Sequence, residues 1–88
     1  MPSRFKIDHD SLTDNDRERQ VEFTAEIAGD DRDFAVKYAV LTELSGDEPE
    51  NDALELFERF SDELVDVCID VAARNTSDLV VITEDDLE

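Results

Sequence analysis

The clearest pattern in the chain is a strict alternation of apolar and polar positions between residues 21 and 27. Its apolar members are Val21, Phe23, Ala25 and Ile27. A period of two residues is typical of a β-strand with one buried face and one face in water. Residues 28–31 supply turn formers, and alternation resumes over residues 34–38. The two segments therefore predict an antiparallel hairpin.

Shorter segments flank this hairpin. Phe5 and Ile7 alternate with basic residues and predict a short first strand, whereas residues 8–19 hold Leu12 as their one core-forming position and predict a loop. Residues 39–44 follow the hairpin and predict a short helix. Gly46 suits the left-handed conformation that commonly ends a helix.

From residue 48 to about residue 75 the pattern changes to that of one long amphipathic helix. Asp47 is its candidate cap, and Pro49 lies in its first turn. Its apolar residues are Leu54, Leu56, Phe57, Phe60, Leu64, Val65, Val67, Cys68, Ile69, Val71 and Ala72. They form an arc wider than the ~100° stripe of a helix that lies on one sheet. The short helix, the loop or a second copy of the chain must cover the remainder.

Residues 79–83 form a β-branched run that predicts a last strand beside the hairpin, and residues 84–88 predict an acidic C-terminal tail. The sequence therefore predicts one α+β domain over residues 1–88, in the order β-β-β-α-α-β. We expect a small antiparallel sheet of three or four strands, packed against one long and one short helix.

Several motifs together resemble the domain-of-unknown-function 1488 family. They are Val21-x-Phe23-x-Ala25, Gly29, Tyr38-Ala39-Val40-Leu41, Ala53-x-x-x-Phe57, Ala72-Ala73-Arg74 and Val81-Ile82-Thr83-x-x-Asp86-Leu87. The resemblance implies a small α+β fold and no assigned activity, so it supplies no catalytic residues. The chain departs from the family in its acidic surface, and in having Val36 and Tyr38 where the third strand would carry a cysteine.

Charge changes the interpretation of the surface. The chain has 26 acidic residues against 8 basic ones and a formal net charge of −18. Hydrated carboxylates in such excess suit a protein that works in molar salt, because salt screens their mutual repulsion. We expect a halophile-adapted cytoplasmic protein. Cys68 is the only cysteine, so no intramolecular disulfide forms, and no apolar run is long enough for a membrane span.

Only one segment brings an imidazole together with carboxylates. In Asp8-His9-Asp10, these groups could bind a divalent metal, or His9 could act as a general base. As a calcium loop starting at Asp8, the segment fails at Leu12, Thr13 and Arg19, which stand where an oxygen ligand, a glycine and a glutamate belong. A solvated acidic loop is the simpler interpretation, and we assign no metal site and no cofactor. A metal- or ligand-binding domain using this loop remains an alternative function.

No catalytic motif is present, so we expect no enzymatic activity. Cys68 lies within the apolar arc and predicts core packing. The basic residues are scattered among acids, which disfavours nucleic-acid binding. An acidic face that imitates DNA is a third hypothesis, with the residues Glu55, Asp62, Glu63, Asp66 and Asp70.

The leading hypothesis is association with a protein partner. If the sheet covers the side of the long helix centred on Leu64 and Phe57, then Leu56, Phe60 and Val67 form an exposed apolar flank. Small proteins seldom keep such a strip without a partner. A symmetric homodimer through this flank is its simplest use. The sequence thus predicts a non-enzymatic interaction or accessory domain.

Overall fold

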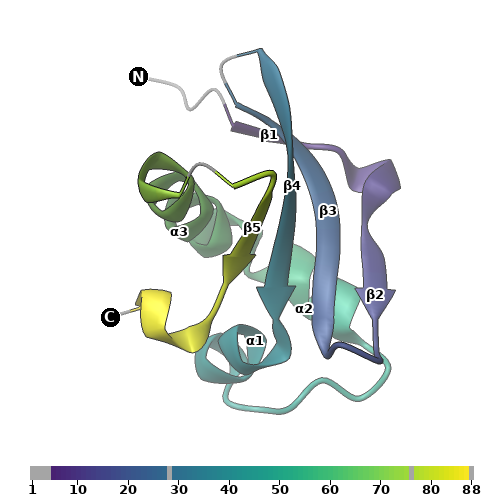
Figure 1. Cartoon of the computed structure of the whole chain (residues 1–88). Helices are drawn as coiled ribbons and strands as arrows, with labels where there is room; N and C mark the ends of the chain where they lie inside the picture. The colour runs from purple at the N-terminus through teal and green to yellow at the C-terminus, as the bar shows by residue number, and fades with distance from the viewer. Residues whose placement is uncertain (1–4, 28, 76, 88) are drawn as a thin grey trace.

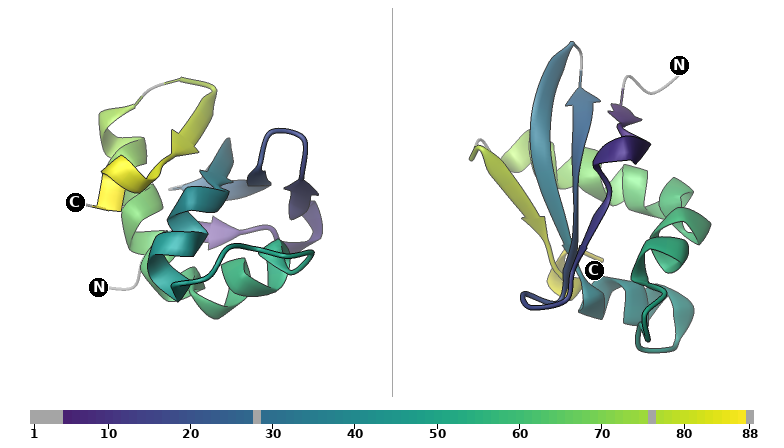
Figure 2. Two further views of the ribbon diagram at one scale, coloured as in Figure 1. Left: turned by 90° about the horizontal axis from the view of Figure 1, so that it is seen from below. Right: turned by 90° about the vertical axis from the view of Figure 1, so that its right-hand side faces the viewer.

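The computed structural model describes residues 5–27, 29–75 and 77–87. Met1 to Arg4, Ala28 of the predicted turn, Thr76 of the predicted loop and Glu88 of the predicted tail lie outside the described residues. The described chain forms two layers, a five-stranded sheet and a layer of helices (Figures 1 and 2). The predicted α+β class is confirmed.

The predicted hairpin is the centre of the sheet. Strand β3 (Gln20–Ile27) pairs antiparallel with β4 (Asp30–Lys37), so that Phe23 lies opposite Phe34 and Val21 opposite Val36. Gly29 in the turn has a φ of 92°, a conformation that glycine adopts without steric cost. The pairing places the apolar alternate residues of both strands on one face.

The segment predicted as a loop over residues 8–19 contains more structure than expected. Strand β1 (Phe5–Ile7) and strand β2 (Thr13–Asn15) both pair antiparallel with β3, and the 3-10 turn η1 (His9–Ser11) separates them. The Thr24 N–H also donates a hydrogen bond of 2.8 Å to Ser11 Oγ. Backbone and hydroxyl pairing holds this edge, which explains why apolar periodicity did not reveal β2.

Strand β5 (Leu79–Ile82) pairs parallel with β4, which gives the strand order β1-β3-β4-β5. The sheet is therefore mixed and five-stranded, not wholly antiparallel with three or four strands. A long helical connection leads from the end of β4 to the start of β5. Such a crossover is what allows a strand to return in the same direction.

The short helix is confirmed as α1 (Tyr38–Ser45), and Gly46 ends it with a φ of 84° and an N–H bond of 2.7 Å to Thr42 O. The prediction of a single long helix from residue 48 to about residue 75 is wrong. The structure has α2 (Ala53–Arg59) and α3 (Ser61–Arg74), which meet at Phe60. A straight helix over residues 48–75 would be about 42 Å long, but the longest extent of the molecule is 34 Å. The break lets both segments pack on the sheet.

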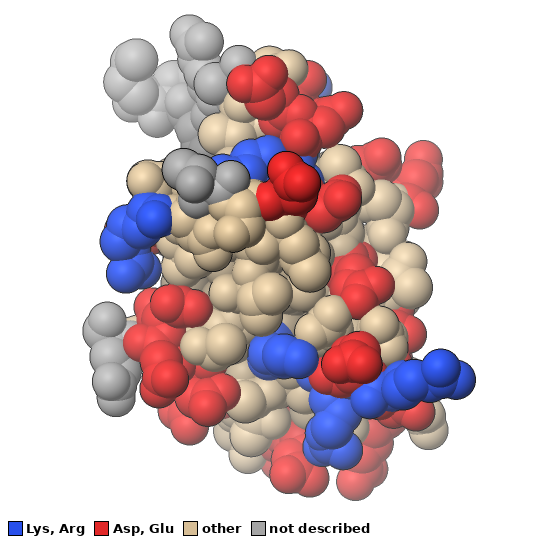
Figure 3. Space-filling model, in the orientation of Figure 1, with Lys and Arg blue, Asp and Glu red and all other residues tan. Residues whose placement is uncertain are grey.

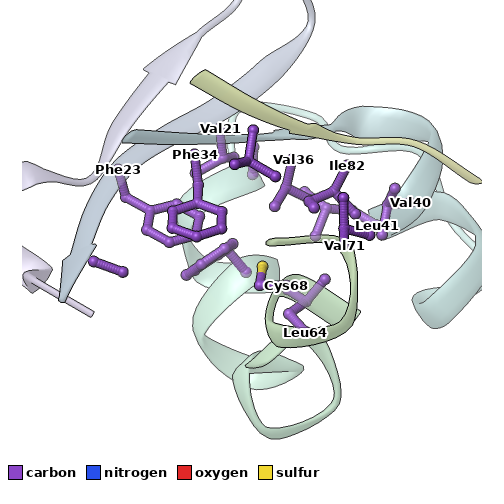
Figure 4. Close-up of a cluster of buried hydrophobic side chains, with 14 of the residues drawn as sticks. Val21, Phe23, Phe34, Val36, Val40, Leu41, Leu64, Cys68, Val71 and Ile82 are labelled. Atoms are coloured by element: carbon purple, nitrogen blue, oxygen red, sulfur yellow. The ribbon is translucent and has the colours of Figure 1, made fainter. Parts of the chain in front are cut away.

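The hydrophobic core lies between the sheet and the helices (Figure 4). The Phe23 and Phe34 rings stack at 5.4 Å between centroids, and Phe57 from α2 contacts Phe23 at 4.9 Å. The predicted acidic tail also joins the structure, as the 3-10 turn η2 (Glu84–Leu87). Leu87, the one apolar residue of this turn, packs against the core.

Candidate functional site

One face of the sheet has no helix over it among the residues that the structure describes. Helices α2 and α3 cover the other face, and α1 closes the core at the end of β4 (Figure 2). Figure 3 views the uncovered side. We call it the open face, and by strand register it consists of Lys6, Thr13, Asn15, Gln20, Glu22, Thr24, Glu26, Asp31, Asp33, Ala35, Lys37, Leu79 and Val81.

The apolar part of the open face lies on β4 and β5. Leu79 is 45% exposed and is the only large hydrophobic residue that is exposed in the described part of the chain. Val81 is half-buried beside it, and Ala35 is fully buried between Val81 and Glu22. A patch without charged side chains is visible at the middle of the surface in Figure 3.

A hollow of about 310 Å³ crosses this face. It extends from the edge formed by η1 and β2, across the central hairpin, to the start of β5. Its lining residues are Ser11, Thr13, Glu22, Phe23, Thr24, Asp33, Phe34 and Leu79. The hollow therefore combines hydroxyl and carboxylate groups with one apolar end.

The two carboxylates of the hollow are held in place by neighbours. Glu22 Oε2 accepts hydrogen bonds from Asn15 Nδ2 at 2.8 Å and from Gln20 Nε2 at 2.6 Å. The Asn15 bond, followed by the Gln20 bond, lowers the pKa of Glu22, so the side chain is ionised at neutral pH. Asp33 Oδ1 accepts from Thr24 Oγ1 at 3.0 Å. Within the described residues, neither carboxylate forms an ion pair.

The three residues of the predicted apolar flank on the helices differ in their burial. Leu56 is 6% exposed and belongs to the core, so its expected place on an exposed strip is wrong. Phe60 and Val67 are half-buried and pack against the core. The break between α2 and α3 explains the difference, because α2 turns its apolar side toward the sheet independently of α3.

The side chains of Asp8 and His9 in the Asp8-His9-Asp10 segment contact neighbouring protein groups. Asp8 Oδ1 accepts a hydrogen bond of 3.1 Å from the Asp10 N–H, which caps η1. His9 Nδ1 lies 3.4 Å from Glu58 Oε1 of α2, and both side chains are more than half exposed. In residues 5–27, 29–75 and 77–87, no three potential metal-binding side chains come together.

The remaining candidates lie on the helical layer. The five acids of the proposed DNA-like face are all exposed. Two of them pair with arginines on the same helix, Glu55 with Arg59 at 3.9 Å and Asp70 with Arg74 at 3.0 Å. Cys68 is buried in the core as predicted, and burial raises the pKa of its thiol to about 12.

These observations define a two-layer α+β fold with one uncovered sheet face. A crystal structure of a DUF1488-family protein of unknown function from Shewanella loihica PV-4 is similar to it, with a TM-score of 0.74 and 20% sequence identity. The match covers 93% of this chain and 94% of that one. The predicted resemblance to this family is thereby confirmed at the level of the fold.

The sequence itself matches no family model and no curated protein. Since the similar structure is of unknown function, it assigns no activity to any residue here. Within residues 5–27, 29–75 and 77–87, no helix has both the length and the apolarity needed to cross a bilayer.

Proposed function

We propose that this chain is a non-enzymatic interaction domain that docks a partner protein on its open face. The supporting observation is Leu79, a large hydrophobic residue that is 45% exposed on a sheet face without a helix over it. Sheets normally bury their apolar positions against another layer. A contiguous apolar patch with a polar rim is typical of a binding surface. Leu79 and the half-buried Val81 beside it form the apolar part of this face.

The chemistry of the hollow suits recognition better than proton transfer. Asn15 and Gln20 hold Glu22 in one orientation, and their bonds lower its pKa. A carboxylate that acts as a general base works best with its pKa raised toward the working pH. The pKa of Glu22 is shifted the other way. Fixed, ionised groups of this kind are typical of positioning contacts in an interface.

Affinity capture with matched variants tests the proposal. We expect the wild-type protein, kept in concentrated KCl, to retain one stoichiometric partner from an extract of its source organism. Leu79→Asp places a charge at the apolar end of the hollow and should abolish capture. Ala39→Asp adds the same charge at an exposed position of α1, outside the open face, and should leave capture intact. Equal capture by both variants would contradict docking on this face.

Self-association through the helices is a second candidate function. Phe60 supports it, because this aromatic side chain is only half-buried at the junction of α2 and α3. In analytical ultracentrifugation, a dimer that uses this flank should dissociate on Phe60→Glu while the circular dichroism spectrum is retained. Loss of folding would instead show that Phe60 serves the core.

We also propose that the domain works in a salt-rich cytoplasm. The support is the excess of 26 acidic over 8 basic residues. In molar salt the Debye length falls to about 3 Å, so the repulsion between these acids is largely screened.

A further inference from the structure

We infer that the segment docked on the open face is basic, and that it lays an arginine or lysine side chain in the hollow between Glu22 and Asp33, with an apolar residue against Leu79. This inference rests on the proposed function and specifies the chemistry of the partner. Three features of the face support it: the donors and acceptors in the hollow, the net charge, and the positions of the two acidic residues in the strand register.

The hydroxyl groups of the hollow have already donated their protons to the protein. Ser11 Oγ donates to Asp8 O at 2.6 Å, Thr13 Oγ1 donates to Ser11 O at 3.1 Å, and Thr24 Oγ1 donates to Asp33 Oδ1 at 3.0 Å. What these groups offer a ligand is therefore oxygen lone pairs. Arginine and lysine are the side chains that carry several donors and no acceptor. The hydrogen-bonding groups of the hollow therefore suit an arginine or lysine side chain even without the contribution of charge.

The charge of the open face favours the same partner. Four carboxylates, Glu22, Glu26, Asp31 and Asp33, stand against two ammonium groups. Glu26 lies directly opposite Asp31 in the hairpin register, and like charges in that position destabilise a sheet. Lys6 lies opposite Glu26 on its other side, so this pair is partly balanced within the sheet. The excess of two carboxylates that remains on the face favours a cationic partner.

The spacing of the carboxylates suits a side chain between them. Glu22 lies opposite Ala35, and Asp33 is two residues from Ala35 on the same face, so the two acids are diagonal neighbours. The Cα atoms of such neighbours are roughly 7–8 Å apart. A guanidinium presents five donors in one plane, so a side chain lying between these two residues can donate to acceptors on either side of it, while its aliphatic stem lies toward Leu79.

A second copy of this chain docked face to face does not fit. In a two-fold interface the same patch meets itself. The open face carries four carboxylates and two ammonium groups, so two copies placed face to face would bring two surfaces of the same net charge together. We therefore commit to a different protein as the source of the basic segment.

Nuclear magnetic resonance titration in molar KCl tests the inference. The probe is a synthetic amphipathic peptide of leucine, alanine and arginine, and its twin carries citrulline, which has a similar shape but no charge, at each arginine. We expect saturable shifts at Thr13, Thr24, Asp33 and Leu79 with the arginine peptide, and binding at least tenfold weaker with the twin. High salt suppresses attraction beyond contact range, since the Debye length is about 3 Å at 1 M.

A matched pair of variants separates the hollow from the overall charge. Asp33→Asn keeps an acceptor for Thr24 and removes one charge, and we expect it to weaken arginine-peptide binding about tenfold, a free-energy change of about 1.4 kcal/mol. Asp62→Asn removes the same charge from the exposed helical face and should leave binding unchanged. Shifts spread over both faces, or equal losses in the two variants, would overturn the inference.

Capture of the native partner distinguishes a failure of this inference from a failure of the proposed function. If Leu79→Asp abolishes capture of the partner but Asp33→Asn does not, the open face binds a protein whose contact is not cationic at the hollow. If both variants lose the partner while Asp62→Asn retains it, the inference is supported.

Discussion

Arg32 on β4 donates a guanidinium hydrogen bond of 2.8 Å to the carbonyl of Asn75, the residue that caps the C-terminal end of α3. The same guanidinium reaches Ala72 O at 3.2 Å and Ser77 O at 2.7 Å. The last carbonyls of a helix have no partner within it, and a cation there also complements the helix dipole. Arg32 therefore joins the two layers at the point where the chain turns toward β5 and Leu79.

Substitution of Arg32 should destabilise the fold. We expect Arg32→Ala to reduce the free energy of unfolding by about 2–4 kcal/mol in urea denaturation, because charged hydrogen bonds contribute about 1.5–3 kcal/mol each and are not additive. Arg32→Lys should recover only part of the loss, since an ammonium cannot reproduce the planar array of donors.

Arg74→Ala is the matched control for this prediction. Its side chain is 61% exposed and pairs with Asp70 on the same helix, a type of ion pair that contributes at most about 1 kcal/mol. If Arg74→Ala destabilises the protein as much as Arg32→Ala, the role assigned to Arg32 is wrong.

Tyr38 should titrate far above an ordinary tyrosine. Burial, together with a hydrogen bond from its hydroxyl to Asp14 Oδ1, raises the pKa of Tyr38 to about 12. The chain contains one tyrosine, so tyrosinate absorbance reports this group alone. We expect a midpoint near 12 in the native protein and near ~10 in urea. A native midpoint at the urea value would contradict the buried, bonded hydroxyl.

The same pKa difference predicts a loss of stability at alkaline pH. The unfolded state releases the tyrosine proton above pH ~10 while the folded state keeps it until about 12. Stability should therefore fall as the pH rises through this window. Tyr38→Phe should lower stability at neutral pH by about 1 kcal/mol. It should also make the fall between these two pH values shallower, as urea denaturation at several pH values would show.

The stability of the domain should rise with KCl. Its net charge of −18 opposes compaction at low ionic strength, and salt screens that repulsion. We expect the urea midpoint to increase steadily from low to molar KCl. A triple variant of exposed acids on α3, Asp62→Asn, Asp66→Asn and Asp70→Asn, should depend less on salt. A midpoint that does not change with KCl in the wild-type protein would contradict the proposed adaptation.

The sequence predicted the elements whose buried side chains recur with a regular period. Alternation over residues 21–27 revealed β3, because every second side chain enters the core. It missed β2, whose residues Thr13, Asp14 and Asn15 pair through their backbones. It also missed the break at Phe60, because the apolar residues on both sides of it continue the same helical period.

The candidate site was harder to predict for a related reason. The polar alternate positions of β3 correctly indicated a face in water, but the run over residues 79–82 has no polar position, so its sequence did not show which side chains would be exposed. Whether Leu79 is covered depends on which face of the sheet the helices pack against. The answer became visible only in the structure, where β5 pairs parallel with β4 and both α2 and α3 lie on the opposite face from Leu79.

The alternation within β5 gives a prediction that separates function from stability. Leu79 is exposed on the open face, whereas Val80 and Ile82 are fully buried in the core. We expect Leu79→Ser to change the free energy of unfolding by no more than about 0.5 kcal/mol, as for most surface substitutions. Ile82→Ala should cost about 2–5 kcal/mol, because it removes buried atoms and leaves a cavity.

The two substitutions should be compared in urea denaturation and in partner capture. Leu79→Ser should weaken capture while the unfolding midpoint stays within error of the wild type. A large loss of stability on Leu79→Ser would place this residue among the structural contacts of β5 and remove the main support for docking on the open face. Unchanged stability with reduced capture is the combination expected of a residue exposed for binding, because Leu79 then costs the monomer little and contributes mainly when a partner covers it.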